Sequence, residues 1–149
     1  MTQKVFTANG LPTLIGSIPL DNHDQALDWI LDHTPEIPLW PQLPGLAQEG
    51  MLVQFLDGLP GLSSDEGGKT HFNTLAADFG DETLAFFEEY FAVLEDPASL
   101  AQSRFQVSKE RAAGLYALAE RMKDKDSAAV KGQITGPFTL LTGVTDQEQ

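Results

Sequence analysis

The sequence predicts an α/β protein with a parallel sheet, and two features of the chain support this. Apolar runs of strand length alternate with segments of helical periodicity, in the order strand, helix, strand, irregular excursion, helices, strand. The 149 residues are 42% hydrophobic, which is enough for a sizeable core. The last predicted strand lies near the C-terminus with no helix after it, and three strands make a small sheet. We therefore expect the first part of a larger fold.

The first predicted elements are a strand and a helix. Residues 11–20 (LPTLIGSIPL) are mostly apolar and predict a short buried strand that ends near Ser17. Asp21 or Asn22 can cap the helix that follows, because either side chain can accept a hydrogen bond from a free amide of the first turn. Pro35 is expected to stop this helix, since proline cannot continue it.

A second strand and an irregular stretch are expected next. Residues 37–40 (IPLW) predict a short strand, in which Pro38 must stand at the start or cost a hydrogen bond. Turn-forming residues are frequent afterwards, as in GLPG at 58–61. We interpret residues 45–80 as an irregular excursion that can include a hairpin, and not as a linker between domains.

Two helices and a third strand complete the predicted order. Asp81 is expected to cap a helix that Pro97 interrupts, and a second helix is expected from about 108 to 123. The apolar residues of the first of these helices repeat at three-to-four spacing: Leu84, Phe87, Phe91 and Leu94. Residues 130–139 (VKGQITGPFT) predict the last strand and its turn.

Composition excludes several functional classes. Without Cys the chain has no disulfide, no thiol nucleophile and no Cys-ligated metal. A formal net charge of -13 argues against nucleic acid as a partner, because binding phosphates relies on clustered Lys and Arg. No apolar run is long enough to span a bilayer, and residues 1–4 lack the apolar stretch of a secretory signal. A cytoplasmic protein without a membrane partner is expected.

Two strand ends carry the candidate binding residues. Gly16 permits close approach to the backbone, and Ser17 presents a hydroxyl where the first strand turns into a helix. Gln133 and Thr135 alternate with an apolar residue at the matching end of the last strand. Ligands bind at the carboxyl ends of parallel strands, although each segment is also explained as a simple turn. For His23 we favour a solvated helix start over a role in ligand binding.

Four segments resemble a known superfamily. LIGSIP at 14–19 resembles the TIGSFP strand that opens the catalytic barrel of cobalamin-independent methionine synthase, and VKGQITGPFTL at 130–140 resembles its KGMLTGPVT strand. GMLVQF at 50–55 is similar to its NDMVEYF segment, and IPLW at 37–40 is similar to the PVW strand of uroporphyrinogen decarboxylase, which has the same barrel. The order and spacing agree from about residue 11 to 144.

The resemblance implies a fold and a binding site. The fold would be an incomplete (β/α)8 TIM barrel, with residues 1–149 as the single N-terminal part of that domain. Ile15, Gly16 and Ser17 match the segment that holds the amino-acid end of homocysteine in methionine synthase. Gln42 stands where the family has a substrate-binding Glu, and Gln133 is expected to line the mouth. Catalytic residues are not identified.

The implied activity is methyl transfer to a thiol acceptor in methionine biosynthesis. The partners would be a small thiol or amino-acid-like substrate and a methyl donor, either a folate or a methylated corrinoid. The family's zinc is held by His, Cys and Glu of later strands, so this chain is expected to have no cofactor of its own. The zinc is expected from a missing C-terminal part. The chain alone is therefore expected to be inactive.

Two alternatives stay open. A metal-free barrel enzyme similar to uroporphyrinogen decarboxylase would act on a large carboxylated substrate, but the motif regions offer no Arg. A non-catalytic fragment would associate into a homo-oligomer through open sheet edges.

Overall fold

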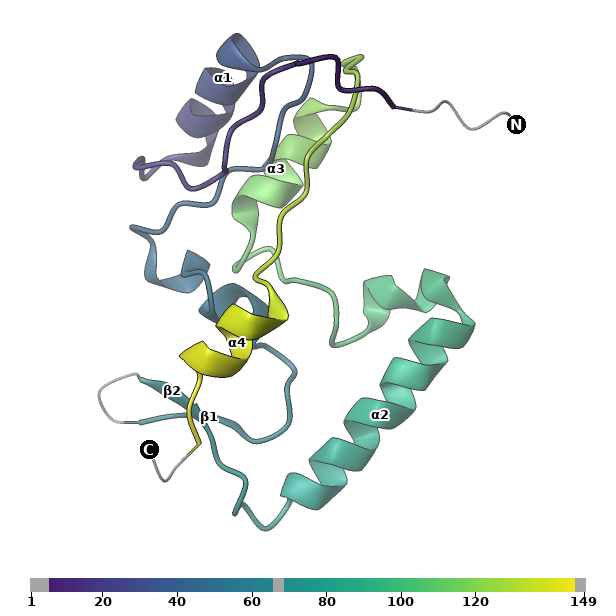
Figure 1. Cartoon of the computed structure of the whole chain (residues 1–149). Coiled ribbons are helices and arrows are strands. Elements are labelled where there is room, and N and C mark those ends of the chain that lie inside the picture. Colours follow the sequence, from purple (N-terminus) through teal and green to yellow (C-terminus); the bar gives the residue numbers. More distant parts are fainter. Residues whose placement is uncertain (1–5, 66–68, 147–149) are drawn as a thin grey trace. The chain divides into compact units, whose positions relative to one another are not determined.

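A computed structural model describes residues 6–65 and 69–146, and the chain divides into two compact units (Figure 1). Unit 1 holds the described residues up to Gly50 together with Lys109–Ile134, and unit 2 holds Met51–Ser108 and the described residues from Thr135 onward. Residues 1–4, on which the expectation about a secretory signal depends, lie outside the described part. Within that part, no helix combines the length and the apolar character needed to cross a bilayer.

The predicted α/β fold with an incomplete (β/α)8 TIM barrel is wrong. In the described ranges the structure is built mainly from helices, and its strands form a single two-stranded antiparallel sheet. Strand β1 (Leu62–Ser64) pairs with β2 (Thr70–Phe72), with Ser63 opposite His71. No regular alternation of parallel strands and helices is present among these residues.

The three segments expected as parallel strands are extended but pair only at single points. Two isolated parallel bridges join them: Ser17 with Gln42, and Leu39 with Lys131. Pro12, Pro38 and Pro41 have no N–H to donate, which reduces the number of donors available for a longer ladder. The segments therefore lie side by side in unit 1 without becoming strands.

Unit 1 is organised around helices α1 (His23–His33) and α3 (Ala113–Arg121), which pack against each other (Figure 1). The predicted cap of α1 is confirmed, since Asn22 accepts a hydrogen bond from the amide of Gln25 at 3.0 Å. The helix ends before Pro35, as expected. The second predicted helix is shorter than the expected range of 108–123. Buried apolar side chains of unit 1 form its core, among them Ile18, Ala26, Ile30, Leu39 and Leu43.

Salt bridges tie the two helices of unit 1 together at the surface. Arg121 of α3 donates to Asp28 at 2.6 Å and to Asp24 at 3.3 Å, both on α1. These hydrogen bonds raise the pKa of Arg121 above its usual value, and the bond to Asp28 has the larger effect. The pairs are exposed, so their contribution to stability is small.

Gly114 marks the closest approach of α3 to the second extended segment. A Cβ at this position would lie 2.1 Å from the carbonyl oxygen of Pro41, a backbone atom that cannot move aside as a side chain can. Replacing glycine by alanine within a helix normally stabilises it by about 0.5–1 kcal/mol. At Gly114 the overlap with Pro41 makes the substitution destabilising instead.

We expect Gly114→Ala to lower the free energy of unfolding by about 1–3 kcal/mol, the usual cost of overpacking. Urea denaturation at equilibrium measures this change. Gly80→Ala in the first turn of α2 is the matched control, because nothing lies within 4 Å of a Cβ built there. Equal effects of the two substitutions would contradict the contact between Gly114 and Pro41.

Unit 2 contains the hairpin and the longest helix. The hairpin of β1 and β2 falls inside the excursion predicted for 45–80. Helix α2 (Phe79–Glu95) starts two residues before Asp81, so the predicted cap is wrong and Asp81 belongs to the first turn. Pro97 interrupts the helix as predicted, and the 3-10 turn η3 (Pro97–Gln102) follows. Two further 3-10 turns are η1 (Ala47–Glu49) in unit 1 and η2 (Val53–Phe55) in unit 2.

The predicted third strand is also wrong, as is the expectation that no helix follows it. Residues 130–135 are extended with a single bridge, and helix α4 (Pro137–Gly143) begins directly after Gly136. Proline is favoured at the first position of a helix, because its ring presets φ and the N–H that it lacks would be unpaired there. The Gly-Pro pair thus starts a helix where a turn was expected.

Candidate functional site

The first and second extended segments meet at Gly16, Ser17 and Gln42. The amide of Ile18 donates to the carbonyl of Gln42 at 3.1 Å, and the amide of Gln42 donates to the carbonyl of Gly16 at 2.9 Å. These two hydrogen bonds join segments that are far apart in the sequence, and they lie on either side of Ser17. The backbone therefore fixes Ser17 beside Gln42.

Gln133 joins the third segment to the other two. Its side-chain Nε2 donates to the carbonyl of Trp40 at 2.8 Å and to Oε1 of Gln42 at 3.2 Å. Its Oε1 is buried and has no hydrogen-bond partner among the described residues. Most buried polar atoms in proteins are paired, so this shielded oxygen is an unused hydrogen-bond acceptor.

Gly16 makes room for the Gln133 side chain. A Cβ on Gly16 would lie 2.1 Å from Nε2 of Gln133, and the φ angle of Gly16 is +114°, a region that side-chain-bearing residues rarely adopt. The backbone of Gly16 and the amide of Gln133 are therefore in direct contact only because residue 16 has no side chain.

Ile15 takes a different place from its neighbours. Ile15 is 83% exposed. Its carbonyl lies 3.3 Å from Nζ of Lys131, which also donates to the carbonyl of Leu14 at 2.5 Å. Of the five residues expected at the site, Gly16, Ser17, Gln42 and Gln133 are brought together, whereas the Ile15 side chain is exposed.

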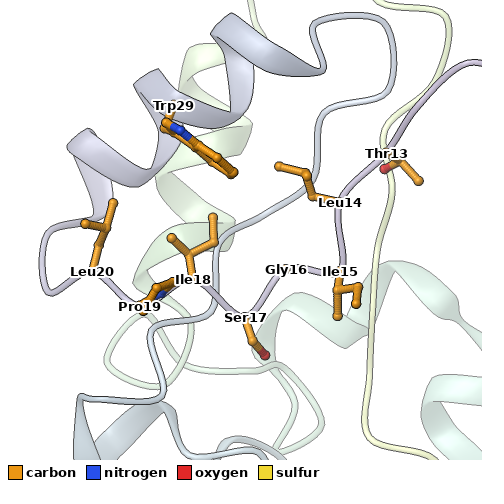
Figure 2. A pocket seen from close by; sticks show the side chains of 9 residues that line it. All are labelled: Thr13, Leu14, Ile15, Gly16, Ser17, Ile18, Pro19, Leu20 and Trp29. Carbon is orange, nitrogen blue, oxygen red and sulfur yellow. The ribbon is translucent and has the colours of Figure 1, made fainter.

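An apolar pocket of about 520 Å³ lies on the α1 side of the first segment (Figure 2). It is lined by residues 13–20 and by Trp29 of α1. Figure 2 shows the indole of Trp29 directed towards Leu14 and Ile18, while the hydroxyl of Ser17 points away from it. Gln42 and Gln133 do not line the pocket. Ser17 thus presents its polar group on the side opposite the apolar pocket.

Glu49 and His23 form a pair that the sequence did not reveal. Oε1 of Glu49 lies 2.6 Å from Nε2 of His23, and Oε2 accepts the amide of Leu43 at 3.0 Å. The Glu49 side chain is only 1% exposed and that of His23 is 22% exposed. His23 begins α1, as expected, but its ring contacts a buried carboxylate, so a wholly solvated helix start was wrong. Glu49 thus links Leu43, which directly follows Gln42, to His23 at the start of α1.

The described residues do not fit the zinc site that the resemblance implies for the complete family enzyme. In residues 6–65 and 69–146, no three His, Asp or Glu side chains are grouped as metal ligands would be, and the sequence has no Cys. Gln42 and Gln133 carry uncharged side chains, so the arrangement offers hydrogen-bonding groups and no charge.

No family model matches the chain, and neither a curated protein nor a solved structure matches it, so its own residues carry the functional inference.

Proposed function

We propose that unit 1 binds the amino-acid end of a small thiol substrate, as the acceptor-binding part of an enzyme similar to cobalamin-independent methionine synthase. The observation that carries this proposal is the unpaired Oε1 of Gln133, buried among three segments that are far apart in the sequence. An ammonium group is a suitable donor to such an oxygen. The exposed hydroxyl of Ser17, fixed beside Gln42, is a suitable donor to a carboxylate.

The chemistry of the proposed site is limited to binding and orientation. Gln42 and Gln133 are uncharged, so they hold an ammonium group by hydrogen bonds without the ion pair that a Glu would supply. The methyl donor would be a folate or a methylated corrinoid, and zinc that activates the thiol would be held by residues outside these 149. No catalytic step is assigned to this chain.

Isothermal titration of the 149-residue chain with L-homocysteine tests the proposal. We expect L-homocysteine to bind and 1-propanethiol, which lacks the amino-acid end, to bind at least about tenfold more weakly, because hydrogen bonds to charged groups contribute about 1.5–3 kcal/mol. Gln133→Ala is expected to weaken L-homocysteine binding by about tenfold for the same reason. Gln25→Ala, an exposed glutamine of α1, is the matched control.

Three outcomes would contradict the proposal: no binding of L-homocysteine, equal binding of the two thiols, or equal losses in Gln133→Ala and Gln25→Ala. Binding of a carboxylated tetrapyrrole in place of L-homocysteine would instead favour the alternative similar to uroporphyrinogen decarboxylase.

A further inference from the structure

Helix α2 of unit 2 presents an exposed apolar seam with the spacing of a coiled coil. The seam consists of Leu84, Phe87, Phe91 and Leu94, which follow the alternating three- and four-residue steps of heptad positions a and d. Their exposed fractions are 60%, 48%, 57% and 60%, respectively. Single exposed apolar residues are common on protein surfaces, whereas a continuous row of this kind marks a surface for interaction.

The opposite side of α2 is already occupied within unit 2. Phe86 packs edge-on against Phe105 with ring centroids 5.1 Å apart. Glu89 accepts hydrogen bonds from the backbone amide and the side chain of Arg104, and these bonds, the side-chain one first, lower the pKa of Glu89. Phe86 and Glu89 thus anchor α2 to its own unit and leave the seam facing outward.

Acidic residues run along one edge of the seam. Asp81, Glu88 and Glu95 are spaced by seven residues, so all three occupy heptad position e, and all three are exposed. They make no ion pair with any residue that the structure describes. The sequence contains no Lys or Arg from residue 70 to 103. The charge of this edge is therefore not balanced by neighbouring side chains.

We propose that α2 binds an amphipathic helix of another protein, one that carries Lys or Arg beside its own apolar seam. In a coiled coil, residues at e face residues at e or g of the partner, and opposite charges there select the partner. Helix α2 has 17 residues and is about 26 Å long, and the seam from Leu84 to Leu94 covers about 15 Å of it. The whole helix admits a partner segment of two to three heptads, of which less than two contact the seam.

A second copy of this chain fits the seam less well. In an antiparallel pair, Glu88 would face Glu88 of the other copy and Asp81 would face Glu95, so like charges would meet along the whole edge. In a parallel pair the e residues would face Thr83 and Tyr90 at position g, which supply no positive charge. Charge complementarity thus favours a basic helix over self-association.

Binding of two designed peptides to the full 149-residue chain tests this inference by fluorescence anisotropy. Both peptides have three heptads with Leu at a and d, and they differ only in carrying Lys or Glu at e and g. We expect the Lys peptide to bind at least about tenfold more tightly at about 50 mM salt, with the difference reduced at about 500 mM.

Two double variants separate docking on α2 from general attraction to an acidic protein. Glu88→Lys with Glu95→Lys is expected to weaken the binding of the Lys peptide by at least about tenfold and to strengthen the binding of the Glu peptide. Asp32→Lys with Glu36→Lys changes the net charge equally on exposed residues of unit 1 and is expected to leave both affinities within about twofold.

Phe91→Ser is expected to weaken the binding of the Lys peptide by about tenfold, because the peptide loses a contact with the seam. Equal losses in the two double variants, unchanged binding to Phe91→Ser, no binding of either peptide, or self-association of the chain through α2 in sedimentation would each overturn the inference.

Discussion

Glu49→Ala is expected to lower the free energy of unfolding of unit 1 by about 2–4 kcal/mol. The Glu49 side chain is almost wholly buried and accepts the amide of Leu43 while contacting Nε2 of His23. Alanine leaves the Leu43 amide without its acceptor and opens a cavity, and both effects destabilise. Urea unfolding followed by tryptophan fluorescence measures the change, since both tryptophans, Trp29 and Trp40, belong to unit 1.

Two further variants define what the Glu49 result means. Glu49→Gln keeps an oxygen for the Leu43 amide and is expected to lose less stability than the alanine variant. Glu110→Ala removes an exposed carboxylate of the same unit and is expected to change stability by no more than about 0.5 kcal/mol. A loss in Glu49→Ala no larger than in Glu110→Ala would show that the buried pair does not hold unit 1 together.

Gly16→Ala is expected to lower the same free energy of unfolding by about 2–4 kcal/mol and to displace Gln133. The positive φ of Gly16 is strained for alanine, and the new Cβ would overlap the side-chain amide of Gln133. That amide would then lose its bonds to Trp40 and Gln42. Urea unfolding with the same fluorescence signal measures the loss.

The neighbouring Gly132→Ala serves as the control for Gly16→Ala. A Cβ on Gly132 would meet nothing within 4 Å, so this variant is expected to stay within about 0.5 kcal/mol of the unchanged protein. The double variant Gly16→Ala with Gln133→Ala removes the overlap, and we expect it to be less destabilised than the sum of the two single changes. Strict additivity would mean that residues 16 and 133 are not in contact.

Local signals in the sequence predicted several elements. Asn22 caps α1, as expected of an Asn or Asp side chain that directly precedes a segment with helical apolar periodicity. The hairpin lies within the turn-rich excursion. These features depend on residues close together in the chain. The parallel sheet was wrong because pairing depends on distant partners, and prolines such as Pro12 and Pro38 deprive the extended segments of the donors that a ladder needs.

The candidate site shows the same division between local and distant information. Gly16, Ser17, Gln42 and Gln133 were expected near one another, and they are, but the overlap that requires glycine at 16 depends on where Gln133 lies. Glu49 carries no signal that separates it from the exposed acidic residues of the chain. Its burial follows from the contacts of His23 and Leu43, which come from different parts of unit 1.

The binding of an amino-acid end at Gly16, Ser17 and Gln133 is tested most directly by nuclear magnetic resonance of the ¹⁵N-labelled chain during titration with L-homocysteine. The account predicts that the side-chain amide of Gln133 and the backbone amides of Gly16 and Ser17 shift together with one dissociation constant, and that 1-propanethiol leaves them in place. Signals that stay unmoved, or that shift with unrelated dissociation constants, would contradict it.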